Sequence, residues 1–189
     1  MLKILLILLL LTGCAKDESC ENCTIEADII EPVFKETSKV ESFSEYSRLK
    51  YPEVLNISSF TQMLKDIENG EEKIYFVSTP DCEHCQRAIE ILGNVAHEKN
   101  ITVENVDPAI QSEQDWQEYY NILEIMPDEF CLINEDGKQL NAPTIFKIKD
   151  KKVISAYLGL PIDFDISDGE LNDLQKEELS QNYAQVIES

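Results

Sequence analysis

The sequence predicts an α/β domain with a central mixed sheet and helices on both faces. From about residue 51 onward, segments with strand and helix patterns alternate along the chain. Segment 74–77 is an unbroken apolar run, which is typical of a strand that is covered on both faces. The last two strand candidates, 145–148 and 153–158, are separated by only four residues and predict an antiparallel hairpin.

The strand candidates are marked by short apolar or alternating patterns. Segment 101–106 alternates apolar and polar residues, and Asp107-Pro108 turns the chain after it. The lysines of the final hairpin are expected on a solvated edge that discourages further strand pairing; they are Lys147, Lys149, Lys151 and Lys152. We expect strands, in chain order, at 54–57, 74–77, 101–106, 145–148 and 153–158.

Four helices are predicted from apolar residues that recur every three or four positions. The first is capped by Ser58 or Ser59 and ends at Asn69-Gly70. The third carries Trp116, Tyr119 and Tyr120, which we expect in the core. We expect helices at about 60–69, 82–99, 116–123 and 171–187.

The connection at 126–141 is unusually long for this arrangement. Its Asn134-Glu135-Asp136-Gly137 sequence predicts a turn between 130–133 and 138–140, so the segment is expected to form a small extra hairpin. This insertion carries Cys131, which is interpreted as a packed cysteine. The alternative is an accessory thiol close to a reactive site.

Cys82 and Cys85 form a CxxC motif at the predicted start of the second helix, directly after the turn that follows segment 74–77. At a helix N-terminus, unpaired backbone N–H groups and the helix dipole favour a thiolate over a thiol. Because the thiolate is the form that attacks a disulfide, the motif predicts disulfide exchange without a metal or cofactor. The alternative for this pair is a structural disulfide or a metal site.

Three features together resemble the thioredoxin-fold family. They are the CxxC motif at a helix start, the order of the elements, and Ala142-Pro143 before the final hairpin. The resemblance covers 51–189. It implies that Cys82 exchanges disulfides with protein thiols, that Cys85 resolves the mixed disulfide, and that an external redox partner exists. It also implies a cis-proline at Pro143, with Ala142 contacting an extended substrate chain.

Some residues depart from the family pattern and bear on the tuning of the motif. Asp81 stands where the family usually has tryptophan, and Phe76 stands where many members have a buried acid. Proton transfer at the second cysteine then needs water or another group. Between the cysteines, His84 is expected to stabilise the first thiolate, whereas Glu83 and Asp81 oppose it, so the sign of the net effect stays open.

The N-terminal segment resembles the signal and lipobox of a bacterial lipoprotein. An unbroken apolar run at 4–11 is too short to span a bilayer, and Thr12-Gly13 precedes Cys14. The resemblance extends to thioredoxin-like lipoproteins of Gram-positive bacteria and, more loosely, to bacteriocin-transport accessory proteins. It implies removal of a 1–13 signal peptide, acyl chains such as palmitate on Cys14, and a lipid-anchored position on the extracytoplasmic face of the cell membrane. An ordinary signal peptide or a buried helix is the alternative.

Residues 14–50 are polar and acidic and are expected to form a largely disordered tether, with a short helix at about 39–49. They contain a second CxxC pair, Cys20 and Cys23, which is interpreted as a local disulfide or two inert thiols. A relay dithiol that reaches the first CxxC is the alternative.

The net charge of −21 argues against nucleic acid and anionic lipid surfaces as partners. The sequence therefore predicts a membrane-anchored, extracytoplasmic thiol–disulfide oxidoreductase whose direction of electron flow is open. The alternative is a non-catalytic binding or export-accessory protein of the same fold, in which the CxxC motif is structural.

Overall fold

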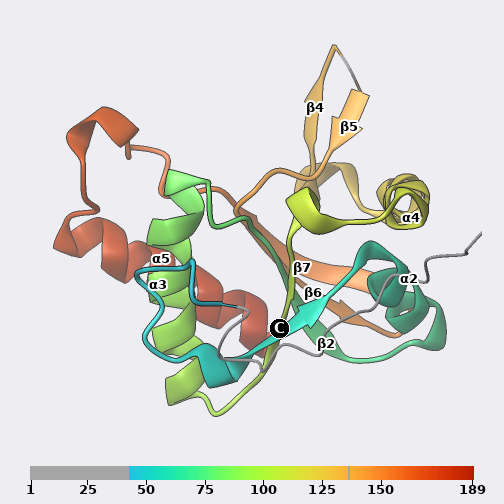
Figure 1. Ribbon diagram of the computed structural model, residues 1–189, viewed down its shortest axis with the longest axis horizontal. Coiled ribbons are helices and arrows are strands. Elements are labelled where there is room, and N and C mark those ends of the chain that lie inside the picture. Colours follow the sequence, from blue (N-terminus) through green and yellow to red (C-terminus); the bar gives the residue numbers. More distant parts are fainter. Residues whose placement is uncertain (1–42, 136) are drawn as a thin grey trace, which may run out of the picture. The chain divides into compact units, whose positions relative to one another are not determined.

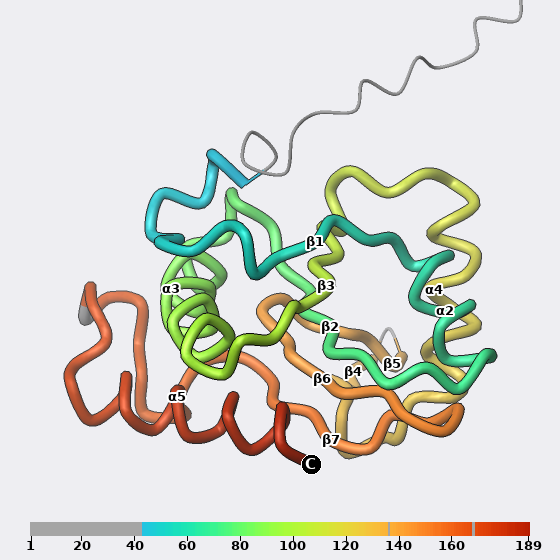
Figure 2. Tube along the Cα trace, turned by 90° about the horizontal axis from the view of Figure 1, so that it is seen from below, coloured from blue at the N-terminus to red at the C-terminus, as the bar shows by residue number. Residues whose placement is uncertain are grey.

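The computed structural model describes residues 43–135 and 137–189. Its central sheet has five strands: β1 (Leu55–Ser58), β2 (Lys73–Val77), β3 (Val103–Val106), β6 (Thr144–Lys149) and β7 (Lys152–Leu158). Their order in the sheet is β1-β3-β2-β6-β7 (Figure 2). The first three run parallel, whereas β6 is antiparallel to β2 and β7 is antiparallel to β6.

Two pairs of helices cover the two faces of this sheet. The helices are α2 (Phe60–Asn69), α3 (Glu83–Glu98), α4 (Glu113–Ile125) and α5 (Asp173–Glu188). Figure 2 shows α3 and α5 on one side of the strands and α2 and α4 on the other. Each pair packs over its own apolar cluster. The predicted fold class, a mixed sheet with helices on both faces, is confirmed.

The central strand β2 is buried on both faces, as its apolar sequence predicts. Ile74 and Phe76 belong to the cluster under α3 and α5, whereas Tyr75 and Val77 belong to the cluster under α2 and α4. This division follows from the alternation of side chains along a strand. β2 is the third of the five strands across the sheet, so the turn that follows it leaves the sheet at a central position.

Local signals in the sequence set the ends of the helices. Ser59 Oγ accepts the N–H of Gln62 at the start of α2, and Gly70 ends that helix in the left-handed region with φ 77°. Helix α4 begins at Glu113, before the aromatic stripe, because Ser112 and Asp115 form a capping box. Within residues 43–135 and 137–189 there are also four short 3₁₀ turns: η1 (Pro52–Val54), η2 (Pro108–Ile110), η3 (Asp128–Phe130) and η4 (Ile166–Asp168).

The inserted segment forms the expected extra hairpin. Strands β4 (Leu132–Asn134) and β5 (Gly137–Gln139) pair antiparallel as a separate two-stranded sheet. Figure 1 shows this hairpin standing away from the main sheet. All residues of β4 are exposed.

Two expectations about burial are wrong. On α4, Tyr119 is buried, but Trp116 and Tyr120 are 37% and 60% exposed, because the buried stripe continues through Ile122 and Leu123 instead. In the final hairpin, Lys147 is buried rather than solvated. Its Nζ lies 2.9 Å from a carboxylate oxygen of Glu72 and donates to two backbone carbonyls at the end of α5, which satisfy its charge.

The expected boundary at residue 51 is also wrong, because the folded part includes residues 43–50. Phe43 and Tyr46 are 4% and 5% exposed and pack in the cluster under α3 and α5. The segment forms turns rather than the expected helix. Arg48 forms an ion pair with Glu170, and the Leu49 side chain lies against Gly93 of α3.

The remaining N-terminal expectations lie outside the described residues. These are the signal peptide, Cys14, the second CxxC pair of Cys20 and Cys23, and the tether up to residue 42. Within the described ranges, none of the helices combines the length and the hydrophobicity that a bilayer span requires.

Candidate active site

The CxxC motif lies where β2 passes into α3. Cys82 is the N-cap residue of α3, and its Sγ accepts the backbone N–H of Cys85 at 3.3 Å. Cys82 is partly exposed, whereas Cys85, one turn further along, is fully buried. The helix start therefore presents one thiol to solvent and holds the other inside.

Hydrogen bonding favours ionisation of the outer thiol. The pKa of Cys82 is lowered from 9.0 to about 6, and the largest cause is a hydrogen bond with the Cys85 side chain. Partial burial acts in the opposite direction. The backbone N–H groups of Cys85 and His84 and the charge of His84 lower the pKa further. The sequence left open whether the net effect of the neighbouring groups favours the Cys82 thiolate. In the structure, the net effect favours it.

The inner thiol is held in its protonated form. The hydrogen bond with Cys82 and burial both raise the pKa of Cys85, and the charge of Asp107 contributes in the same direction. A backbone hydrogen bond to Thr79 opposes these effects. Two thiols of the same chemistry thus have opposite protonation preferences.

The loop between β7 and α5 frames the exposed side of the motif. The ring of Phe164 lies edge-on to His84, with the ring centroids 6.2 Å apart, and the Arg87 guanidinium lies 5.7 Å from the centre of the same ring. Arg87 also donates to the backbone carbonyls of Gly169 and Glu83. Sequence reasoning did not include this loop in the site, because nothing in its local pattern predicts contact with α3.

Ala142 and Pro143 lie at the same end of the sheet as the CxxC motif. Their peptide bond is cis, as the resemblance implies. Thr144, the next residue, pairs with Val77, which is the last residue of β2 before the turn to Cys82. The carbonyl of Pro143 accepts the N–H of Gly159 at 2.8 Å. The substrate contacts expected of Ala142 and Pro143 stay predictions.

Phe76, six residues before Cys82, is an apolar side chain in apolar surroundings. Phe76 is fully buried and packs edge-on against Tyr183 of α5, with ring centroids 6.3 Å apart. The hydroxyl of Tyr183 is buried and has no hydrogen-bond partner among the described residues. This part of the core therefore offers no carboxylate to the buried thiol.

A polar chain that sequence reasoning missed lies on the other side of the motif. Tyr46 and Ser78 are joined by a 2.7 Å hydrogen bond between their hydroxyls, and Ser78 Oγ donates to Asn105 Oδ1 at 2.6 Å. All three residues are buried. Their positions in the sequence gave no signal, since they belong to three separate segments.

Cys131 lies on the opposite side of the sheet from α3. It follows η3 at the base of the β4–β5 hairpin and packs against the cluster under α2 and α4. Burial is the main cause that raises the pKa of its thiol. These surroundings favour a packed cysteine over an accessory thiol.

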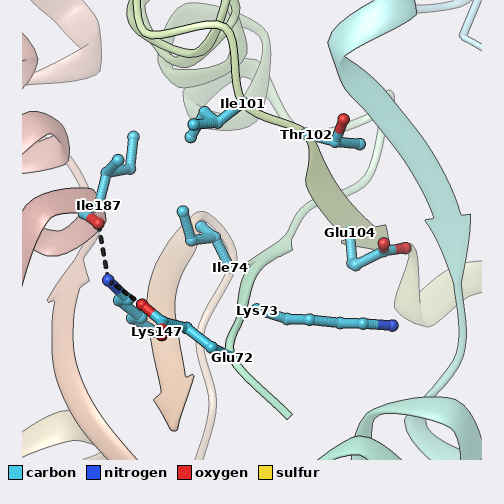
Figure 3. Close-up of a pocket in the computed structure, with 8 residues that line it drawn as sticks. All are labelled: Glu72, Lys73, Ile74, Ile101, Thr102, Glu104, Lys147 and Ile187. Carbon is cyan, nitrogen blue, oxygen red and sulfur yellow. Dashed lines mark hydrogen bonds and ion pairs between the residues drawn. The ribbon is translucent and has the colours of Figure 1, made fainter.

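A cavity of about 590 Å³ lies at the other end of β2, and Figure 3 shows the residues that line it. Its charged groups have partners within the protein: Lys147 pairs with Glu72, and Lys73 pairs with Asp66 at 2.7 Å. Glu104 accepts a hydrogen bond from the Asn56 side chain at 3.0 Å. The cavity does not include the CxxC motif. Among the residues that the structure describes, no three His, Cys, Asp or Glu side chains are grouped so as to hold a metal ion.

The sheet order, the CxxC motif at the start of α3 and the cis-proline before β6 together define a thioredoxin-like fold. No family model matches the sequence, and no curated protein matches it either. Among solved structures, the chain is similar to a thioredoxin from Trypanosoma brucei brucei, with 12% identity, a TM-score of 0.42, and coverage of 71% of this chain and 92% of that one. It is also similar to an oxidised thioredoxin from Arabidopsis thaliana, with 12% identity, a TM-score of 0.39, and coverage of 69% and 95%.

Proposed function

We propose that the protein is a thiol–disulfide oxidoreductase that reacts through Cys82 and Cys85. The observation that carries this proposal is the contrast between the two thiols, since one is accessible with a pKa of about 6 and the other is buried with a raised pKa. At pH 7, a thiol with a pKa of about 6 is ionised in roughly nine molecules out of ten. In such a pair, the accessible thiolate attacks a disulfide, and the buried thiol stays protonated until it resolves the mixed disulfide.

The reaction proceeds in two exchange steps. The Cys82 thiolate attacks one sulfur of a client disulfide, a mixed disulfide forms, and the other client sulfur leaves as a thiolate. Cys85 then loses its proton and attacks Cys82 Sγ. The Cys82–Cys85 disulfide forms, and the client leaves reduced. The reverse sequence oxidises a client, and an external dithiol or disulfide restores the starting form.

The proposed clients are proteins with an extended, accessible segment around the reacting cysteine. The backbone of Ala142, beside the buried Pro143, contacts this segment, because both residues lie at the sheet end from which Cys82 emerges. His84 and Glu83 modulate the attacking thiol from its own helix turn, and their side chains are exposed to the approaching client.

We further propose that the protein acts outside the cytoplasm, held to the cell membrane by lipid on Cys14. The support is the apolar run at 4–11 followed by Thr12-Gly13-Cys14. Cys14→Ala is expected to abolish incorporation of a labelled fatty acid and to release the protein from the membrane fraction. If Cys14→Ala remains in that fraction and labelled as the wild type is, the anchoring proposal is wrong.

The exchange proposal is tested by mixing the oxidised protein with a reduced, unfolded test protein and following disulfide transfer. Wild type is expected to transfer its disulfide, Cys82→Ala is expected to be inactive, and Cys85→Ala is expected to accumulate mixed disulfides when challenged with a client disulfide. Cys131→Ala serves as the matched control and is expected to retain activity. If wild type and Cys82→Ala behave alike, the pair is structural and the protein is a binding protein of this fold.

The direction of electron flow is decided by the reduction potential of the Cys82/Cys85 pair in glutathione buffers. A potential near about −270 mV indicates a reductase, and one near about −120 mV indicates an oxidase. A low thiolate pKa stabilises the reduced form of the pair relative to its disulfide. We therefore expect the potential to lie on the oxidising side of about −270 mV.

A further inference from the structure

The buried thiol needs a proton acceptor during the second exchange step. Cys85 is fully buried, and it must be deprotonated before it can attack Cys82. On one side, the apolar Phe76 offers no acceptor. An acceptor for this proton is needed only if the pair exchanges disulfides as proposed above. Polar groups that could receive it lie on the side of the motif opposite Phe76.

A small pocket lies at the ends of β2 and β3, next to the segment that leads into Cys82. Its volume is about 90 Å³, which is enough for water. Tyr46, Pro80, Asn105 and Asp107 contribute polar groups or backbone to its lining. Hydrogen bonds from Tyr46 to Ser78 and from Ser78 to Asn105 fix the positions of the lining residues Tyr46 and Asn105.

Strand pairing brings Asp107 beside the CxxC turn. Val77 of β2 pairs with Val106 of β3, and the N–H of Ser78 donates to the carbonyl of Val106 at 3.1 Å. Asp107 follows Val106 directly and therefore lies next to the turn of residues 78–81. The Cys85 thiol hydrogen-bonds to the backbone of Thr79 in this same turn.

We propose that Asp107 accepts the proton of Cys85 through water in this pocket and returns it in the reverse reaction. One oxygen of the Asp107 carboxylate accepts the N–H of Ala109 at 2.9 Å, and a carboxylate has capacity for further hydrogen bonds. Asp107 is partly exposed, so it can pass the proton on to solvent. Its charge contributes to the raised pKa of Cys85, which is consistent with its proximity to that thiol.

The step balances without any further reactant. The Cys85 proton passes to water and then to Asp107, and the Cys85 thiolate attacks Cys82 Sγ in the mixed disulfide. The Cys82–Cys85 bond forms as the bond between Cys82 and the client breaks, and the client sulfur leaves with the electron pair. Asp107 then releases the proton to solvent.

The other titratable groups that act on Cys85 are unsuited to this role. Cys82 has no proton to exchange while it is part of the mixed disulfide. Burial is the main cause that raises the pKa of Tyr46, and the proton of Tyr46 is donated to Ser78. Tyr183 is fully buried, and burial raises its pKa well above the usual value. Asp107 differs from these groups because its carboxyl group is partly exposed and lines the pocket, so water can reach it.

The test separates proton transfer from a simple charge effect, because the two predict opposite signs. If Asp107 acted only through its charge, Asp107→Asn would lower the pKa of Cys85 and speed its attack. If Asp107 accepts the proton, Asp107→Asn slows that attack, by about 10²-fold. Asparagine can still accept the Ala109 N–H, so the local turn is retained.

The experiment mixes the reduced full-length protein with dithiobis-nitrobenzoate and follows the coloured thiolate. The first phase reports attack by Cys82, and the second reports resolution by Cys85. We expect Asp107→Asn to slow the second phase alone and Asp107→Glu to restore part of the rate. Glu45→Gln, which changes the other carboxyl group that lines the pocket, is expected to keep the wild-type second phase.

The outcomes distinguish this inference from the proposed function. A second phase in Asp107→Asn that is as fast as wild type, or faster, overturns the role of Asp107 and leaves the exchange proposal standing. If the wild-type protein shows neither phase, the proposed function is wrong, and the role of Asp107 is overturned with it.

Discussion

At the scale of single residues, Cys82 and Cys85 differ only in their surroundings. Cys82 occupies the N-cap of α3, where backbone N–H groups and the neighbouring thiol stabilise a negative charge. Cys85 lies one turn deeper among buried side chains. The short spacing of a CxxC motif at a helix start is therefore sufficient to give two identical side chains different reactivity.

The exposed His84 is expected to contribute to the acidity of Cys82. Its charge lowers the pKa of the thiol, so His84→Gln should raise that pKa, by less than about one unit because the ring is exposed. The measurement is the pH dependence of Cys82 alkylation. Lys65→Gln, which removes an exposed charge on α2 on the opposite face of the sheet from α3, should leave the midpoint unchanged. An unchanged or lower midpoint in His84→Gln would contradict this role.

The hydroxyl of Tyr183, which has no hydrogen-bond partner within the described part of the chain, is expected to cost stability rather than to provide it. Tyr183→Phe removes a buried polar group without losing a hydrogen bond, so the free energy of unfolding should stay level or rise by up to about 1 kcal/mol. Tyr75→Phe is the matched control. It removes a 2.6 Å hydrogen bond to Asp66 and should lower the free energy of unfolding by about 1–3 kcal/mol. Denaturant titration of both variants measures the difference, and a clear loss in Tyr183→Phe would show that its hydroxyl has a partner.

At the scale of elements, α2 is fixed to β2 by a buried carboxylate. Asp66 accepts hydrogen bonds from Gln62 and Tyr75 and pairs with Lys73. Burial acts to raise the pKa of Asp66, but the hydrogen bonds from Lys73, Tyr75 and Gln62 outweigh it, and the pKa is lowered. The contact therefore stabilises the ionised form.

Replacement of this carboxylate is expected to weaken the α2–β2 contact in a pH-dependent way. Asp66→Asn should lower the free energy of unfolding by about 1–3 kcal/mol at pH 7. Because the folded-state pKa lies below the unfolded value of about 4, the contribution is complete above pH 4 and is lost as the pH falls through the folded-state pKa. Denaturant titration between pH 2 and about 7 should show wild type and Asp66→Asn converging at low pH. A constant difference across that range would contradict the assignment.

The elements were predictable from the sequence because their signals are local. Apolar periodicity marked every strand of the main sheet and every long helix, and Ser59, Gly70 and the turn at 134–137 marked ends and connections. Burial was less predictable, because it depends on partners far away in the chain. Lys147 is buried because it meets Glu72 and the last turn of α5, which a cluster of neighbouring lysines cannot reveal.

In the candidate site, too, some residues were predictable from local sequence and others were not. The CxxC motif and the proline before β6 are sequence signals, and both lie at one end of the sheet. Tyr46, Asp107 and Phe164 were missed, because their relation to the motif arises only when separate segments fold together. Tyr46 and Ser78, for example, are 32 residues apart.

At the scale of the whole molecule, residues 43–50 are part of the folded domain. Phe43 and Tyr46 extend the core under α3 and α5, and the side chain of Gln86 donates to the backbone carbonyls of Glu45 and Pro80. This segment thus joins the N-terminal part of the chain to the helix that carries the CxxC motif.

Disruption of this segment is expected to destabilise the domain. Phe43→Ala removes a buried aromatic side chain and should lower the free energy of unfolding by about 3 kcal/mol. Glu45→Ala changes an exposed side chain in the same segment and should have an effect within about 0.5 kcal/mol. Thermal or denaturant unfolding measures both. Equal stability of the two variants would mean that the segment is a tether, as the sequence alone suggested.

The most direct test of the proposed exchange site is the pH dependence of alkylation of each cysteine in the reduced protein. Mass spectrometry of the separated peptides assigns the rate to Cys82 or to Cys85. We expect Cys82 to react with a midpoint near pH 6 and Cys85 to remain unreactive throughout the neutral range. A midpoint near 9 for Cys82, or equal rates for the two thiols, would contradict the asymmetry on which the proposed function depends.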